Sequence, residues 1–213
     1  GPHATGESRT ANPPTEWSET RNVRWKVEIP GRGTGSPVVW GDRLFLLSAV
    51  PIGAEGAASH EPRGQIQPRD LHRFIVLAID RHTGRVVWER TAREERPREP
   101  SMKDGTWASS SAITDGQRVF AFFESSGLYA YDMAGNLLWQ KHLGEKKMFA
   151  DVGESGSTPV LYGNRLVIAW DHQGASFVVA LDARTGQEIW RAGRQEVDSW
   201  STPLVVEHAG RAQ

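Results

Sequence analysis

The 213-residue chain has no cysteine, no long apolar run and almost no net charge. Without cysteine, disulfides, thiolate nucleophiles and Cys-ligated zinc are excluded. No stretch reaches the roughly 18 apolar residues that a membrane-spanning helix needs, and the N-terminal segment lacks the charged start and apolar core of a signal peptide. The formal net charge of −1 leaves no excess of Lys and Arg for binding nucleic acid.

Helical periodicity is missing as well, since no segment shows a 3.6-residue repeat over about ten residues. The chain instead contains 22 Gly and 12 Pro, which favour turns over long helices. Short apolar runs bounded by these residues predict an all-β fold.

One turn occurs three times, as AIDRHTGRVVW (78–88), AYDMAGNLLW (130–139) and ALDARTGQEIW (180–190), and the Trp residues that end the copies are 51 residues apart. We expect the Asp to accept backbone N–H bonds, the Gly to adopt a positive φ, the Thr to support the loop and the Trp to pack on a neighbouring unit. The middle copy is one residue shorter and has no Thr. The predicted structural residues are Asp80, Gly84, Trp88, Asp132, Gly135, Trp139, Asp182, Gly186 and Trp190.

Upstream of each turn lie two short apolar runs joined by a Gly-containing turn and followed by Arg, which is typical of a β-hairpin. Each unit then has four consecutive antiparallel strands, and their recurrence predicts β-propeller blades. We place an extended segment at 1–21 and a partial propeller at 22–213. Its blades cover about 36–92, 110–143 and 157–193, with an outer strand of a preceding blade around Trp25 and an incomplete blade from 201.

The turn resembles that of the PQQ-like propeller repeat family, named after pyrroloquinoline quinone, which includes quinoprotein dehydrogenases and outer-membrane assembly lipoproteins. The resemblance covers about 22–213 and rests on the Asp, Gly and Trp positions of the three copies. It implies that the chain is an N-terminal fragment of a propeller of about eight blades. It also implies a periplasmic or exported parent protein.

Strand parity places the connections between units and the loops between second and third strands at one end, opposite the repeated turns. At this end, aligned positions of the units carry Arg32, Trp107, Glu154 and Asp198, four different chemistries where a purely structural position would repeat. These are binding candidates or merely solvated loop residues. The predicted binding candidates are Arg32, Trp107, Glu154, Asp171, His172, Asp198 and Trp200.

Asp171 and His172 form the most suggestive pair, because a His beside a carboxylate serves as a base or a metal ligand, although such a pair also stabilises a turn. No ligand spacing such as HExxH occurs, so we predict no metal site. The first unit has about 20 extra residues near 50–73, which form either a lid or partner-binding loop or a surface insertion.

Three functions remain open. The first is a non-catalytic propeller scaffold that needs no cofactor and binds a protein or small molecule on its open face, with self-association through open blade edges as a further possibility. The second is a PQQ- and calcium-dependent quinoprotein oxidoreductase, although family dehydrogenases often carry an adjacent Cys pair that is missing here. The third is a hydrolase using Glu154, Asp171 and Asp198. The sequence favours the scaffold.

Overall fold

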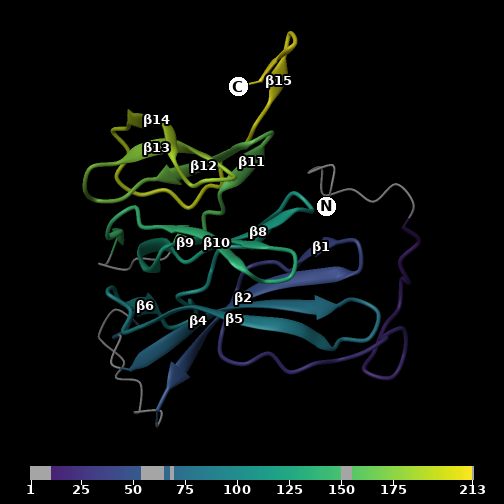
Figure 1. The fold of residues 1–213 in the computed structure, drawn as a ribbon. Helices are drawn as coiled ribbons and strands as arrows, with labels where there is room; N and C mark the ends of the chain where they lie inside the picture. Colours follow the sequence, from purple (N-terminus) through teal and green to yellow (C-terminus); the bar gives the residue numbers. More distant parts are fainter. Residues whose placement is uncertain (1–10, 54–64, 68–69, 150–154, 213) are drawn as a thin grey trace.

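The computed structural model describes residues 11–53, 65–67, 70–149 and 155–212. These residues form three four-stranded antiparallel sheets and two short strand pairs (Figure 1). Among the described residues, η1 (Glu124–Ser126) is a short 3-10 turn between two strands. The predicted all-β fold of four-stranded propeller blades is confirmed.

Each sheet is a meander in which strands that follow one another along the chain are neighbours. The first sheet consists of β1 (Val38–Trp40), β2 (Arg43–Ile52), β4 (Leu71–Asp80) and β5 (Val86–Glu95). The second consists of β7 (Ile113–Thr114), β8 (Arg118–Phe122), β9 (Leu128–Asp132) and β10 (Leu137–Lys141). The third consists of β11 (Val160–Tyr162), β12 (Arg165–Trp170), β13 (Phe177–Asp182) and β14 (Glu188–Gly193).

The two short pairs lie outside these sheets. β3 (Gln65–Ile66) pairs with β6 (Ser101–Met102), and β15 (Glu207–His208) pairs with β16 (Arg211–Ala212). The second of these pairs is a hairpin in the last described unit, with Glu207 opposite Ala212 and His208 opposite Arg211.

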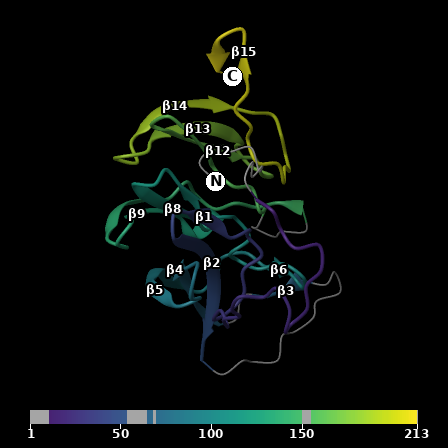
Figure 2. The ribbon, with the colours of Figure 1, turned by 90° about the vertical axis from the view of Figure 1, so that its right-hand side faces the viewer.

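The sheets stack in chain order, with the second between the first and the third (Figures 1 and 2). Strands β8 and β9 therefore bury both faces. Val119 and Ala121 face a core shared with Phe45 and Phe74 of the first sheet. The alternate residues of β8 and β9 pack with the third sheet in a second core. This two-sided burial explains why β8 has no polar face.

A tryptophan from each unit packs on the corner turn of the next. The indole nitrogens of Trp25, Trp88 and Trp139 donate to the backbone oxygens of Arg81, Met133 and Ala183, at 2.9, 3.0 and 3.1 Å. Trp25 does so from an extended segment that pairs with no strand of the described residues, so the outer strand expected there is not formed. Its contact is nevertheless equivalent to those of the other two.

Glycine is required beneath each indole for two reasons. Gly84, Gly135 and Gly186 have φ values of 72°, 84° and 71°, in the left-handed region that side chains disfavour. A Cβ at Gly135 would also lie 2.9 Å from the ring of Trp88. The residue two places after each Trp adds a second contact in two of the copies. Arg90 Nε donates to the Gly135 oxygen at 2.7 Å, and Lys141 Nζ donates to the Gly186 oxygen at 3.3 Å.

The Asp of each corner organises the turn through its carboxylate. Asp80 Oδ1 accepts the Thr83 backbone N–H and hydroxyl, both at 2.9 Å. The middle copy has no Thr, and Asn136 replaces it: its backbone N–H donates to Asp132 Oδ1 at 2.8 Å and its side-chain amide to Oδ2 at 2.7 Å. These bonds lower the pKa of both carboxyls, through Thr83 for Asp80 and through Asn136 for Asp132.

Small residues that precede the first strand of each sheet connect that sheet to the next one by hydrogen bonds. The backbone amides of Ser36, Ser111 and Thr158 donate to the hydroxyls of Ser111, Thr158 and Thr202, at 2.9, 3.0 and 3.1 Å. At the preceding position, the hydroxyls of Ser110 and Ser157 donate to the oxygens of Ser157 and Ser201, both at 2.9 Å. Gly35 has no side chain here because a Cβ would meet the Ser110 oxygen.

Trp190 packs on no corner turn among the described residues. It is 42% exposed, whereas Trp88 is 7% exposed. All of β14 is exposed in the same way.

Candidate functional site

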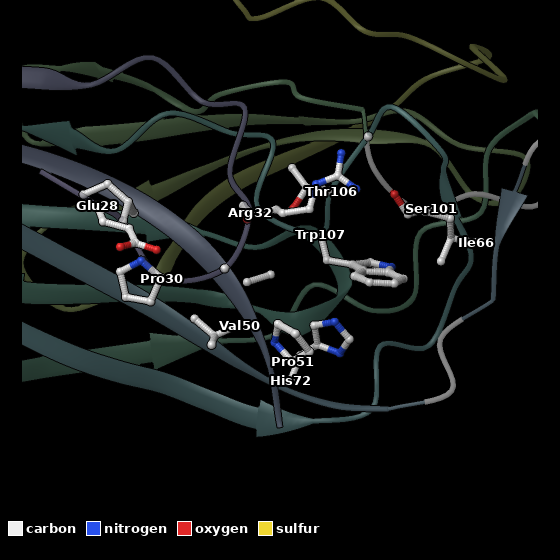
Figure 3. Close-up of a pocket in the computed structure, with 14 residues that line it drawn as sticks. Glu28, Pro30, Arg32, Val50, Pro51, Ile66, His72, Ser101, Thr106 and Trp107 are labelled. Atoms are coloured by element: carbon white, nitrogen blue, oxygen red, sulfur yellow. Dashed lines mark hydrogen bonds between the residues drawn. The ribbon is translucent and has the colours of Figure 1, made fainter. Parts of the chain in front are cut away.

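The first hollow at the loop end of the sheets lies over the first sheet, and we call it the Trp107 pocket. It has a volume of about 390 Å³, within the range of small-ligand sites. Its walls come from the chain before β1, the upper ends of β2 and β4, and the chain between β6 and β7. Two predicted candidates, Arg32 and Trp107, meet here (Figure 3).

The backbone around Arg32 is firmly held. Its N–H donates to the Ala49 oxygen at 3.0 Å, and the Ala49 N–H donates back to the Arg32 oxygen at 2.8 Å. The Thr106 hydroxyl also donates to the Arg32 oxygen, at 2.9 Å. The segment approaches β2 so closely that a Cβ at Gly31 or Gly33 would collide with the β2 backbone. The pocket wall is therefore fixed, while the Arg32 side chain is exposed.

Trp107 and His72 form the floor of the pocket (Figure 3). Trp107 Nε1 donates to the Glu99 oxygen at 2.9 Å, and its ring meets that of His72 at 4.7 Å, edge to face. Burial lowers the pKa of His72, so the imidazole is neutral at pH 7. His72 Nδ1 lies 3.0 Å from the Asp70 oxygen and so carries the proton, which makes Nε2 an acceptor.

A second hollow adjoins the first, and we call it the Trp200 hollow. Its volume is about 380 Å³, and Gly105 borders both hollows. Its wall includes three exposed apolar side chains: Phe149, 66% exposed, Trp200, 56%, and Met102, 40%. Trp200 is a predicted candidate, whereas Phe149 and Met102 are not, because single apolar residues in loops give no periodic signal.

The remaining acidic candidates are held by structural bonds. Asp198 Oδ1 accepts the Phe149 backbone N–H at 2.8 Å, and Oδ2 accepts the Gln173 amide at 3.2 Å. Asp171 is 2% exposed and accepts Arg194 Nε at 2.7 Å. Within the described residues, Asp171 Oδ2 and His172 Nδ1 are buried without a hydrogen-bond partner. Glu154, the remaining candidate from the aligned loop positions, lies outside the described residues.

A buried ionic cluster that was not predicted from the sequence lies between the second and third sheets. Lys146 is fully buried; its Nζ donates to Glu124 Oε2 at 3.0 Å and to Ser155 Oγ at 2.7 Å, and it lies 5.5 Å from the Trp170 ring centre. Glu124 adopts a φ of 50°, a strained conformation for a residue with a side chain.

The cluster resembles a catalytic serine site, but the hydroxyl is fully used. Ser155 Oγ donates to Glu124 Oε1 at 2.9 Å and accepts both Lys146 Nζ and the Ser157 N–H, the latter at 3.1 Å. Both lone pairs are occupied, so none is free to attack a substrate. We therefore assign the cluster a structural role.

A comparison of the repeats at another position would have detected His72 and Glu124, which are not among the predicted candidates. Six places before the Ala of each corner stand His72, Glu124 and Gly174. Different side chains at equivalent positions of the repeats are the signal that also identified Arg32 and Trp107.

A PQQ and calcium pair requires several converging oxygen ligands. In residues 11–53, 65–67, 70–149 and 155–212, no group of three or more His, Cys, Asp or Glu side chains is placed to hold a metal ion. The described side chains therefore do not fit this group.

With the fold and the site described, comparison with known proteins is informative. A family model described as outer membrane protein assembly factor BamB, of the PQQ-like repeat type, matches residues 15–209. The chain belongs to this family. The chain has no match among curated protein sequences. None of its described helical residues form a segment with the length and apolarity that crossing a bilayer requires.

Solved structures of other proteins resemble the chain, and the quinohemoprotein dehydrogenase below has a similar fold. Quinohemoprotein alcohol dehydrogenase ADHIIG from Pseudomonas putida HK5 matches with 18% identity and a TM-score of 0.52. The match covers 79% of this chain and 22% of the dehydrogenase. BamB from Moraxella catarrhalis matches with 14% identity and a TM-score of 0.41, covering 79% and 54%. The chain thus spans about a fifth of the first structure and about half of the second. At these identities the likeness describes the fold alone.

Proposed function

We propose that the chain is a non-catalytic propeller scaffold whose loop end binds a protein partner outside the cytoplasm. The observation that carries this proposal is the pair of adjoining hollows at the loop end, lined by Trp107 and by the exposed Phe149, Trp200 and Met102. Exposed apolar side chains gathered around a hollow are typical of protein-binding surfaces, where aromatic residues and Met are enriched.

The polar groups at the same end support this choice. Asp171, Asp198 and Ser155 are each held by bonds that stabilise loops or sheet interfaces. A hydrolase would need at least one carboxylate or hydroxyl directed at a substrate. The family description, outer membrane protein assembly factor, supports an assembly role in the periplasm or a similar compartment.

The proposal is tested by placing a photo-crosslinking amino acid at Phe149 in the full protein, with Arg85 at the opposite corner as the matched exposed control. We expect a discrete protein adduct from position 149, identified by mass spectrometry, and none from position 85. Equal labelling at both positions would contradict a partner site at the loop end.

A titration with PQQ and calcium, followed by absorbance and calorimetry, addresses the oxidoreductase. Saturable one-to-one binding that depends on calcium would overturn the scaffold proposal.

A further inference from the structure

Arg32 stands where the two hollows meet. It lines the Trp107 pocket, and Thr34, two residues later on the same segment, lines the Trp200 hollow. Gly105 on the opposing chain borders both. Anything that lies across the two hollows therefore passes the Arg32 side chain.

The guanidinium of Arg32 has no partner in the described part of the chain, where no hydrogen bond or ion pair involves it. Glu28, a carboxylate that also lines the pocket, forms no ion pair with Arg32, and the two side chains are drawn well apart in Figure 3. Two half-buried arginines of the first sheet are paired, Arg43 with Asp80 at 3.5 Å and Arg73 with Glu89 at 3.8 Å. Arg32 is thus a cation that can pair with a group from outside.

Apolar side chains lie on both sides of Arg32. The wall of the Trp107 pocket includes the indole, the neutral His72 ring, Pro51 and Ile66, beside the polar Ser101 and Thr106. The wall of the Trp200 hollow includes Phe149, Trp200 and Met102. An anionic group is attracted to the cation between them, and bulky apolar groups fit on either side, where they exclude water.

We propose that this surface binds a segment of a partner protein in which an acidic residue is flanked by bulky apolar side chains. The carboxylate pairs with Arg32, and the two apolar side chains enter the Trp107 pocket and the Trp200 hollow. This inference rests on the proposed scaffold function and specifies the chemistry of the partner.

The test uses three fluorescently labelled peptides with blocked ends, Gly-Ser-Phe-Asp-Leu-Ser-Gly and its versions with Asn or Lys in place of Asp, and measures affinity by fluorescence anisotropy. We expect the Asp peptide to bind about tenfold more tightly than the Asn peptide, as a charge-assisted pair at a partly desolvated rim predicts. Arg32→Ala should remove this preference, and Arg32→Glu should transfer it to the Lys peptide. Arg85→Ala, which removes an exposed arginine at the opposite end, should leave it unchanged.

Each other outcome overturns the inference in a distinguishable way. If the peptides bind equally, or if Arg32→Ala keeps the preference, the acidic specificity is wrong while protein binding at this face stands. If N-acetylphenylalanine binds as tightly as the Asp peptide, the site takes a small carboxylate and not a protein segment. If no peptide binds, the inference fails, and the crosslinking at Phe149 decides the scaffold function separately. Circular dichroism confirms that each Arg32 variant is folded, as expected because Arg32 holds β2 through its backbone.

Discussion

Replacing Trp88 by Ala tests whether the corner contacts hold the sheets together. The indole is 7% exposed, donates to the Met133 oxygen at 3.0 Å and lies on Gly135. Its loss removes that hydrogen bond and leaves a cavity between two sheets, so we expect a loss of about 3–5 kcal/mol in the free energy of unfolding. For a chain of this size the melting temperature falls by about 6–20 °C.

Trp190 supplies the matched control, because it has the same place in its own unit but is 42% exposed. Trp190→Ala should cost less than about 1 kcal/mol. Urea unfolding followed by far-ultraviolet circular dichroism measures both, since backbone amides dominate this signal. Equal losses for the two variants would refute the idea that docking on the next corner, and not the tryptophan itself, provides the stability.

Replacing Gly135, on which the Trp88 indole lies, tests the same contact independently. Gly135→Ala forces a Cβ to 2.9 Å from the Trp88 ring, whereas Gly163, with a φ of 57°, has no heavy atom within 4 Å of that position. Both variants incur the left-handed backbone cost of about 1–2 kcal/mol, and Gly135→Ala adds a clash of about 1–3 kcal/mol. This excess should disappear when Trp88 is also replaced by Ala.

Two further perturbations test the polar parts of the fold. Lys146→Met leaves Glu124 buried without its cation and should destabilise the protein by about 3–5 kcal/mol in urea unfolding. The double variant Lys146→Met, Glu124→Gln should recover much of this loss. No recovery would mean that the ion pair is not the cause. The lowered pKa of Asp80 contributes stability that is present above the unfolded value of 3.8 and is lost as the pH falls through the folded value. The difference in unfolding free energy between wild type and Asp80→Asn should therefore shrink from pH 7 to about pH 3, and a constant difference would exclude a role for the carboxylate charge.

The repeated corner was predictable from the sequence because its chemistry is local. Asp80, Thr83 and Gly84 lie within five residues, and their hydrogen bonds and positive φ need no distant partner. Repetition then identified the tryptophans, since equal spacing indicates equivalent surroundings. Asn136 shows the limit of this reasoning, because it supports the turn from a position where the other copies have no Asn.

The sites were less predictable because they depend on contacts between distant segments. Arg32 and Trp107 were found by comparing repeats, but their meeting in one pocket depends on how two connections fold over β2. Lys146 was missed because a lysine in a loop is ordinarily solvated. Its burial depends on Glu124, in the η1 turn between β8 and β9, and on Ser155, in the chain before β11.

Each unit carries both halves of its joints: a corner that receives an indole from the unit before it and an indole for the unit after it. A gene segment that encodes one unit, if duplicated in frame, would therefore carry both a corner turn and an indole. The new unit could pack against the copies on either side of it. Because the interfaces between units are equivalent, whole units can be gained or lost while the fold is kept. The loops at the opposite end can then diverge toward new partners.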